Sequence, residues 1–266
     1  MSDGAPGTTE RYVHAERVHW WYRGRRRILL PLLERYLSGN RRRILDIGSG
    51  SGAMLLLLRR FGTVRGTESD PDLVRHARSQ GLDIVVQEFP RQVPEGRFDV
   101  VTLFDVLEHL EDDRSALASI HGLLEPRGIL FMTVPALPWL YSTYDEGAGH
   151  YRRYDRDLLR RRLRETGFRL LHLTYFNTFL LPLAVAARVF RLRPGNRPPP
   201  ASTCERLEAL QDQDLRIPSP PVNELLARIF GAETSWASGP GLPTGVSLLA
   251  VAQKEGAGFD NPLPRE

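Results

Sequence analysis

The stretch RILDIGSGSG at residues 43–52 decides the fold that this sequence predicts. Residues 44–47 are a short, mainly apolar run of the kind found in buried strands, and every second residue from Gly48 to Gly52 is glycine. Glycines at these positions let the backbone turn sharply with positive φ and leave bare peptide N–H groups open to a ligand. The apolar segment from Ala53 to Phe61 predicts a helix directly afterwards, so the turn would present a helix N-terminus, where ligands commonly bind.

The glycine spacing and the acidic residue Asp46 distinguish this turn from the dinucleotide-binding fingerprint G-x-G-x-x-G. In that fingerprint the third glycine comes one residue later than it does here, and no acidic residue directly precedes the loop. A carboxylate beside the turn suits a ligand that carries a cation and hydroxyls better than a bare pyrophosphate. An NAD-type oxidoreductase therefore stays an alternative that the glycine spacing disfavours.

The rest of the chain repeats the alternation of strand and helix. Asp70 followed by Pro71 is a typical helix start after the second strand. Alternating strands and helices indicate an α/β fold with a mainly parallel sheet. The later strands are expected at residues 64–68, 82–87, 98–104, 129–134, 168–175 and 245–253, with helices at 71–80, 114–124 and 155–166 among them.

Residues 44–52 resemble motif I (hh-D-hG-x-G-x-G) of the class I S-adenosylmethionine-dependent methyltransferases. Further matches follow in the right order at residues 66–68, 98–110 and 124–135, and the resemblance is close from Arg43 to Phe168. The ends, at residues 19–26 and 243–249, are similar to a bacterial subgroup with D-x-x-E-H-L after the fourth strand. The resemblance implies a Rossmann-like doubly wound sheet of seven strands with the last antiparallel, S-adenosylmethionine as cofactor, and in-line displacement of its methyl group.

We expect the chain to divide into five parts around this core. The apolar run at 179–187 is shorter than the roughly 20 residues that a bilayer span needs, and Pro182 interrupts it, so membrane contact through 176–190 is only a lesser alternative. Residues 204–213 and 222–230 are expected to form short helices. The predicted parts are an N-terminal helical cap (1–40), the methyltransferase core (41–175), an insertion on the acceptor side (176–241), the last core strand (242–254) and a disordered tail (255–266).

Glu68 is the leading cofactor ligand besides the glycine turn. It lies 22 residues after Asp46 (68 − 46), and an acidic residue at this distance, at the end of the second strand, is placed to bind both ribose hydroxyls. The resemblance implies that Glu88 and Phe89 contact adenine, and that the aromatic segment 19–26 covers the pocket or simply packs as a capping helix, with Arg26 reaching the methionine carboxylate. The full set of predicted cofactor ligands is Asp46, Gly48, Ser49, Gly50, Gly52, Glu68, Ser69, Glu88, Phe89, Phe104, Asp105 and Arg26.

Asp105, Glu108 and His109 follow the fourth strand, and ligands of open α/β sheets bind at the carboxyl ends of strands. His109 is the first candidate for a general base and His150 the second, because histidine titrates near neutral pH. A merely structural His109, hydrogen-bonded in place, is the alternative.

The same three residues resemble the E-x-x-E-H metal cluster of small-RNA 2′-O-methyltransferases and a similar segment of ubiquinone-biosynthesis O-methyltransferases. On a helix they would share one face, where they could hold a divalent cation. Asp105 is one methylene shorter than the usual first ligand, and we predict no metal.

The loop after the fifth strand is predicted to face the acceptor. Tyr144, Tyr151, Arg152 and Arg153 would suit an acceptor with a ring and an anionic group, and packing in the core is the alternative for the tyrosines. The resemblance implies a small molecule methylated on oxygen or nitrogen.

The composition limits the kinds of partner and the cellular compartment that we expect for this protein. The net charge of +4 comes almost wholly from arginine, with Lys254 the only lysine, which suggests a GC-rich genome rather than a phosphate-binding surface, so we expect no nucleic-acid partner. The single cysteine, Cys204, excludes an internal disulfide and fits a cytoplasmic enzyme, and no signal peptide is apparent at residues 1–10. An RNA methyltransferase, although no N/D-P-P-Y/F motif follows the fourth strand, and a non-catalytic cofactor-binding partner protein stay open as alternatives.

Overall fold

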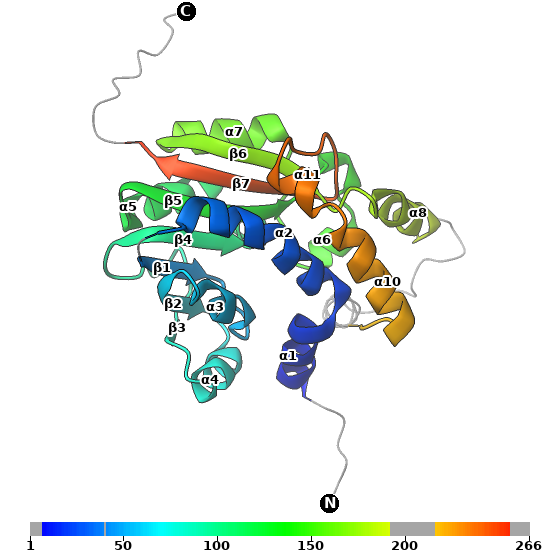
Figure 1. Ribbon diagram of the computed structural model, residues 1–266, viewed down its shortest axis with the longest axis horizontal. Helices are drawn as coiled ribbons and strands as arrows, with labels where there is room; N and C mark the ends of the chain where they lie inside the picture. The colour runs from blue at the N-terminus through cyan, green and yellow to red at the C-terminus, as the bar shows by residue number, and fades with distance from the viewer. Residues whose placement is uncertain (1–6, 40, 192–215, 256–266) are drawn as a thin grey trace, which may run out of the picture.

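A computed structural model describes residues 7–39, 41–191 and 216–255. Its sheet has seven strands in the order β3-β2-β1-β4-β5-β7-β6 (Figure 1). Strands β1 to β5 pair in parallel, and β7 runs antiparallel to both β5 and β6, which confirms the predicted fold class. The strands are β1 (Arg42–Ile47), β2 (Gly62–Glu68), β3 (Ile84–Val86), β4 (Phe98–Phe104), β5 (Leu124–Pro135), β6 (Phe168–Phe176) and β7 (Ser247–Lys254).

The centre of the sheet explains the apolar runs of the sequence. Residues 44–47 of β1 and 100–104 of β4 are buried, as expected of parallel strands that have helices on both faces. The chain passes from β1 outward to β2 and β3 and then returns to β4 on the other side of β1. This reversal opens a crevice at the carboxyl ends of β1 and β4, which is where such sheets bind ligands.

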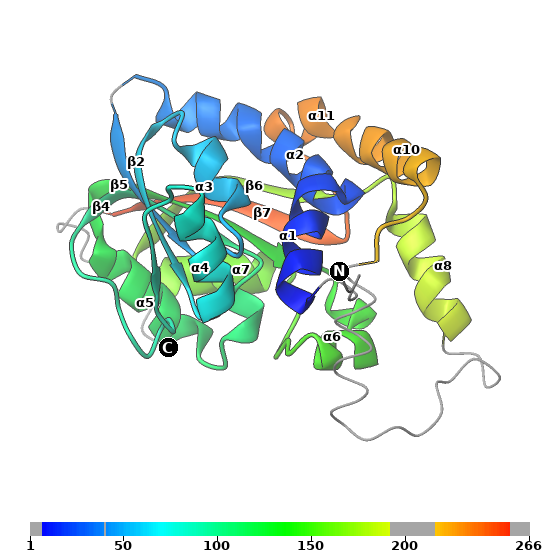
Figure 2. The same ribbon diagram turned by 90° about the horizontal axis from the view of Figure 1, so that it is seen from below.

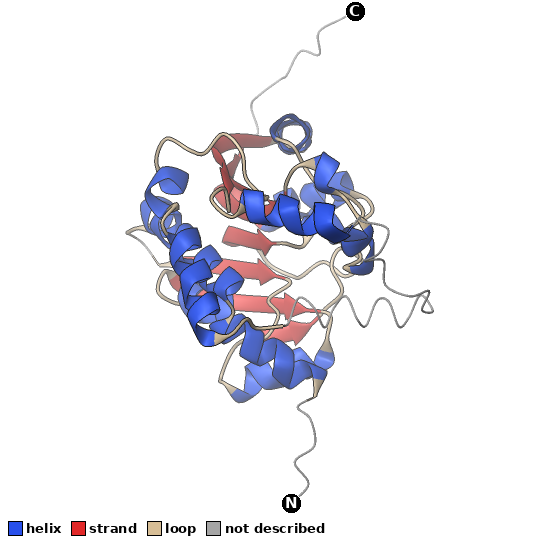
Figure 3. Cartoon of the chain, turned by 90° about the vertical axis from the view of Figure 1, so that its right-hand side faces the viewer, coloured by secondary structure: helices blue, strands red, loops and turns tan. Residues whose placement is uncertain are grey.

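Helices cover both faces of the sheet (Figures 2 and 3). On one face lie α2 (Trp20–Leu37) and α3 (Ala53–Leu58), and on the other lie α5 (Asp113–Leu123) and α7 (Arg156–Glu165). Helix α4 (Pro71–Ser79) follows β2 and contacts β2 and β3. Side chains spaced three and four apart on α2, from Ile28 to Leu33, are fully buried in the core, and Tyr36 packs edge-on against Phe131 of β5 at 6.1 Å between ring centroids. Helix α2 is thus a layer of the core rather than a peripheral cap.

The segments that flank α2 bind it tightly. Helix α1 (Thr8–Val18) precedes it, while α10 (Pro220–Gly231) and α11 (Thr234–Ser238) pack along it (Figure 1). Phe230 stacks on Trp21 at 5.3 Å and on Phe176 at 6.0 Å between ring centroids. Gly24 makes this possible, since a Cβ there would lie 2.1 Å from the Phe230 ring. The predicted insertion therefore supports α2 through its second half, while α8 (Leu181–Arg191) reaches the loop after β5.

Several local predictions were wrong. The segment after β4 does not begin a helix: it forms one 3-10 turn, η1 (Leu107–His109), and α5 starts only at Asp113, capped by Asp112. The expected loop at 135–149 contains a second 3-10 turn, η2 (Pro138–Leu140), and α6 (Thr143–Gly147). The segments 192–215 and 256–266, with the predicted helix at 204–213 and most of the predicted tail, lie outside the described residues. None of the described helices combines the length and the apolar character that crossing a membrane requires.

Candidate functional site

The glycine turn and Glu68 form one preorganised unit. Gly48, Gly50 and Gly52 all have positive φ, at 72°, 55° and 89°. One carboxylate oxygen of Glu68 accepts the backbone N–H of Gly50 at 2.9 Å, and the other accepts those of Ser69 at 2.7 Å and Asp70 at 3.1 Å. The Ser69 hydroxyl also donates to this carboxylate at 3.1 Å. The carboxylate is thus fixed beside the turn, and a ribose hydroxyl would bind it by replacing the Ser69 hydroxyl or by sharing an oxygen with the backbone donors.

Asp46 and Ser49 support the turn from behind. The Asp46 side chain is 2% exposed and accepts a hydrogen bond from the Thr102 hydroxyl, while the Ser49 hydroxyl donates to the Asp46 carbonyl at 2.9 Å. Burial raises the pKa of Asp46 to about 6. Both residues hold the backbone of the turn in place.

Helix α1 closes over the same turn. A carboxylate oxygen of Glu16 accepts both the N–H of Ser51, at 3.0 Å, and the Ser51 hydroxyl. A Cβ on Gly50 would lie 2.9 Å from the Tyr12 hydroxyl and 3.0 Å from the Glu16 carboxylate. Tyr12 and Glu16 were not among the predicted site residues, because nothing in the polar pattern of residues 8–18 marks either as packed against a loop about 35 residues away.

Of two neighbouring arginines, the structure brings Arg25 rather than the predicted Arg26 to the carboxyl end of β4. Arg26 donates to the carbonyls of Glu16, at 2.8 Å, and Arg17, at 3.2 Å, and so ties α2 to α1. Arg25 is buried and pairs with the Asp105 carboxylate. Its Nε is buried and has no hydrogen-bond partner among the described residues, so Arg25 keeps a donor for a ligand.

Two aromatic rings lie close to the Arg25 guanidinium. It lies 5.4 Å from the centroid of the Tyr22 ring and 6.0 Å from that of Phe104. Asp105 has a φ of 57° and also accepts the Thr133 hydroxyl at 2.9 Å. Asp105 and Phe104, predicted as cofactor ligands, therefore lie around Arg25.

The two residues expected at adenine are placed differently from each other. Phe89 is 9% exposed and packs within the core cluster, whereas Glu88 is exposed and pairs with Arg91 at 2.8 Å. The carboxylate of Glu88 thus already has a cationic partner three residues along the chain.

The two predicted base candidates meet in space although 41 residues separate them (150 − 109). The rings of His109 and His150 lie 4.7 Å apart between centroids and are nearly perpendicular. Partial desolvation of its ring, together with the neighbouring His150, lowers the pKa of His109, so its ring is neutral at neutral pH and can accept a proton.

Glu108 joins the two histidines. One ligand atom from each of these three residues lies within 4.8 Å of the others, which suits a single divalent cation as well as proton transfer. Glu108 is 1% exposed, its Oε2 has no hydrogen-bond partner in the described part of the chain, and burial and the nearby Asp105 raise its pKa. The metal alternative with Asp105 as a ligand was wrong in geometry, because Asp105 pairs with Arg25 and no helix carries the three residues.

Arg152 and Arg153, which were predicted to bind the acceptor, already have hydrogen-bond and ion-pair partners within the protein. Arg153 is buried and donates to Asp145 at 2.7 Å and to the Ala136 carbonyl at 2.9 Å. Arg152 donates to the Leu110 carbonyl at 3.0 Å and pairs with Asp113 at 3.3 Å. Both guanidinium groups fasten the loop, which argues against the prediction that they bind an anionic group of the acceptor.

The two predicted tyrosines differ in exposure. Tyr151 is 54% exposed, and the Arg152 guanidinium lies 5.9 Å from its ring centroid. Tyr144 is half-buried, and the Arg188 guanidinium of α8 lies 5.5 Å from its ring centroid. Tyr151 thus offers an open aromatic surface beside His150, whereas Tyr144 belongs to the contact between α6 and α8.

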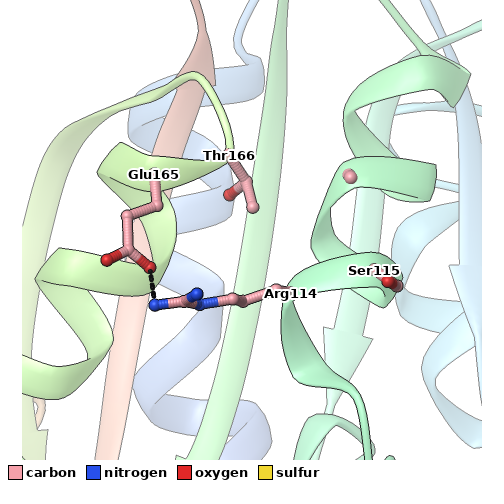
Figure 4. Close-up of a pocket in the computed structure, with 5 residues that line it drawn as sticks. Arg114, Ser115, Glu165 and Thr166 are labelled. Atoms are coloured by element: carbon pink, nitrogen blue, oxygen red, sulfur yellow. Dashed lines mark ion pairs between the residues drawn. The ribbon is translucent and has the colours of Figure 1, made fainter.

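A hollow of about 450 Å³ lies between α5 and α7 (Figure 4). Arg114 and Glu165 form an ion pair of 2.9 Å across it, and Ser115, Ala118 and Thr166 complete its lining. None of the residues predicted for the site lines this hollow, and we assign it no part in the function.

Comparison with known proteins agrees with this arrangement. A family model described as a methyltransferase domain matches residues 20–173. The ubiquinone biosynthesis O-methyltransferase of Alkalilimnicola ehrlichii is 32% identical over 168 residues, which are 53% of this chain and 68% of that protein.

Two solved structures are similar in fold. One is a complex of the Haloferax volcanii Trm112 methyltransferase activator with a protein described as a methyltransferase: its TM-score is 0.58 at 18% identity, with 92% of this chain and 94% of that chain covered. The other is a methyltransferase dependent on S-adenosylmethionine from Archaeoglobus fulgidus, with a TM-score of 0.54 at 18% identity and coverage of 91% and 99%.

The chain belongs to the family of methyltransferase domains. It is a class I methyltransferase, and its cofactor is S-adenosylmethionine.

Proposed function

We propose that this enzyme transfers the methyl group of S-adenosylmethionine to an oxygen or nitrogen atom of a small-molecule acceptor. The observation that carries the proposal is the Glu68 carboxylate, which three backbone N–H groups hold beside the glycine turn. The similarity to an enzyme named for ubiquinone biosynthesis and O-methylation supports a small acceptor and favours oxygen. The expectation of a cytoplasmic enzyme rests on cysteine usage and is part of this proposal.

In this proposal the cofactor lies across the carboxyl ends of β1, β2 and β4. Its ribose hydroxyls donate to Glu68, and its methionine carboxylate accepts from the free Nε of Arg25. Hydrogen bonds between charged partners are roughly twice as strong as neutral ones, so Arg25 would contribute a substantial share of the affinity. Asp105 keeps the guanidinium in position from its other end.

On the acceptor side the histidine pair has the main role. Displacement at a sulfonium methyl needs no covalent intermediate on the protein, so holding the two reacting atoms in line supplies most of the acceleration. His109 removes the proton of a hydroxyl or ammonium acceptor, which adds about 10²–10⁴-fold. Its exposure in the structure leaves it open to an acceptor from solvent.

Calorimetric titration with S-adenosylhomocysteine tests the cofactor half of the proposal. We expect micromolar affinity for wild type, no comparable affinity for NADH, and a loss of about tenfold or more, over 1.4 kcal/mol, in Glu68→Ala. Asp83→Ala is the matched control, because Asp83 is an exposed acid that pairs with Arg65 on β2 and does not contact the turn. Equal affinity of wild type and Glu68→Ala would show that the Glu68 carboxylate does not bind the cofactor, and would contradict the proposal.

An acceptor screen tests the other half. Cofactor with a labelled methyl group is incubated with the protein and with phenols, catechols and amines, and separately with a transfer-RNA mixture. Label in a small molecule supports the proposal. Label in RNA would support the RNA-modifying alternative, and binding without transfer to any acceptor would favour the non-catalytic partner.

A further inference from the structure

Asp145 is a fully buried carboxylate next to His150, and the mechanism above gives it no role. Its Oδ1 accepts from Arg153 Nε at 2.7 Å and lies 3.2 Å from His150 Nδ1. Its Oδ2 lies 3.0 Å from the Ser142 N–H, 3.3 Å from the Ser142 hydroxyl and 3.4 Å from the Arg188 guanidinium. Asp145 itself lies on α6, and its partners besides His150 come from the N-cap of that helix, from the segment between α6 and α7, and from α8, so the carboxylate lies where these segments meet.

The chemistry of these partners decides where the proton of His150 lies. Burial alone would raise the pKa of Asp145, but the hydrogen bond with His150 and the guanidinium groups of Arg153 and Arg188 outweigh it and hold the pKa below its ordinary value. An ionised carboxylate can only accept hydrogen bonds. The ring nitrogen that faces it must therefore carry a hydrogen, and in a neutral imidazole the other nitrogen then has a lone pair.

We propose that Asp145 is a positioning residue, which fixes His150 in the Nδ1–H tautomer so that its Nε2 lone pair is turned away from the carboxylate and toward the acceptor site. This inference rests on the proposed function, because it assigns the use of that lone pair to methyl transfer. In the same loop, the backbone carbonyl of Gly149 accepts a hydrogen bond from the His109 ring. One segment, residues 145–150, thereby orients both histidines.

Through α8, the insertion also has a specific role on the acceptor side. Arg188 of α8 donates to the Leu140 carbonyl at 2.5 Å as well as approaching Ser142 and Asp145. The contact between α8 and the histidine pair thus runs through the Asp145 carboxylate. A carboxylate that orients a functional histidine acts through hydrogen-bond geometry. At metal sites, removing such a partner typically lowers activity about 10–100-fold, and we expect a loss of similar size here.

The first test is the tautomer itself, measured on the protein alone. Long-range ¹H–¹⁵N NMR of protein labelled at histidine, at about pH 8 where an ordinary imidazole is neutral, distinguishes protonated from unprotonated ring nitrogens. His150→Gln assigns the signal among the seven histidines. We expect wild-type His150 as the Nδ1–H tautomer, and a predominant Nε2–H tautomer would overturn the proposal.

The second test uses Asp145→Asn, which keeps the shape of the side chain and removes its charge. Loss of the charge weakens the acceptor that faces His150 Nδ1, and the new amide N–H₂ can donate to that nitrogen or to the Ser142 hydroxyl, so the ring proton shifts toward Nε2. We expect this change in the NMR signal, together with a kcat lower by about 10–100-fold and unchanged affinity for S-adenosylhomocysteine.

Asp155→Asn is the matched control, since Asp155 caps α7 through the Leu158 N–H and contacts neither histidine. Full activity or an unchanged tautomer in Asp145→Asn would contradict the proposal. Should the proposed function itself fail, wild type would show no methyl transfer while the tautomer could still be measured, so the two failures are distinguishable.

Discussion

The cofactor end and the acceptor end of this site are built in opposite ways. At the cofactor end, backbone N–H groups of residues 50, 69 and 70 hold Glu68, and all of them lie within one stretch of about 20 residues. At the acceptor end, His109, His150 and Arg188 come from three segments spread over 80 residues and meet through buried ion pairs. Local backbone geometry builds the ribose-binding part of the first end, although Arg25 is held there by Asp105, whereas long-range side-chain contacts build the whole of the second.

This difference predicts that the two ends fail differently when they are altered. Changes at the cofactor end should alter binding of S-adenosylhomocysteine, and changes at the acceptor end should alter turnover while binding persists. A variant that alters both quantities equally would show that the two ends are one coupled unit.

The largest effect is expected for His109→Gln. Removal of the general base should lower kcat by about 10²–10⁴-fold, while calorimetric affinity for S-adenosylhomocysteine stays within error of wild type. His76→Gln on α4 is the control, because His76 lies on a helix remote in sequence from the histidine pair. A kcat near that of wild type would leave His109 with a structural role only.

A smaller effect, on binding alone, is expected for Arg25→Met. Loss of the guanidinium should weaken S-adenosylhomocysteine by about tenfold or more, which is over 1.4 kcal/mol. It should not weaken 5′-methylthioadenosine, which lacks the amino acid part. Arg26→Met is the matched control one residue away, since Arg26 bonds only carbonyls of α1 in the described structure.

The comparison between the two ligands sharpens the assignment of Arg25. Because Arg25 also pairs with Asp105, the variant leaves a charge without its partner, so Arg25→Met/Asp105→Asn should be measured alongside it. Equal losses for both ligands would place Arg25 away from the methionine carboxylate.

A further effect concerns the stability of the ligand-free protein at the cofactor end, not ligand binding or turnover. The folded-state pKa of Asp46, about 6, lies above its unfolded value, so the stability it contributes is full below about pH 4 and is lost as pH rises through 6. Asp46→Asn should therefore stabilise the ligand-free protein above pH 6 by up to about 3 kcal/mol, with little change at pH 4. Urea denaturation at both pH values measures this, and an equal difference at the two values would contradict it.

The same contrast explains how far the sequence alone could be interpreted. The glycine turn, Glu68 and the positions of the central strands depend on short apolar runs and on spacing, which a single sequence displays directly. His109 and His150 could be named as candidates from their residue type, although nothing in the sequence showed that their rings meet. The choice of Arg25 over Arg26 was beyond sequence reasoning, since a rotation of α2 by one residue decides which guanidinium is buried.

For Arg152 and Arg153, by contrast, the sequence favoured a binding role that the contacts in the structure argue against. Arg152 and Arg153 look like an anion-binding pair in sequence, yet buried acids at Asp113 and Asp145 neutralise them in the fold. Whether a charged side chain faces a ligand or a partner depends on segments that lie 8 to 40 residues away. Periodicity and motif spacing contain no such information.

A crystal structure of the enzyme with S-adenosylhomocysteine tests the central claim most directly. The account predicts that the ribose hydroxyls lie on the Glu68 carboxylate, the methionine carboxylate on Arg25, and the sulfur on the side that faces His109 and His150. A ligand bound away from the glycine turn, or a sulfur atom facing away from the histidine pair, would contradict the assignment of both ends of the site.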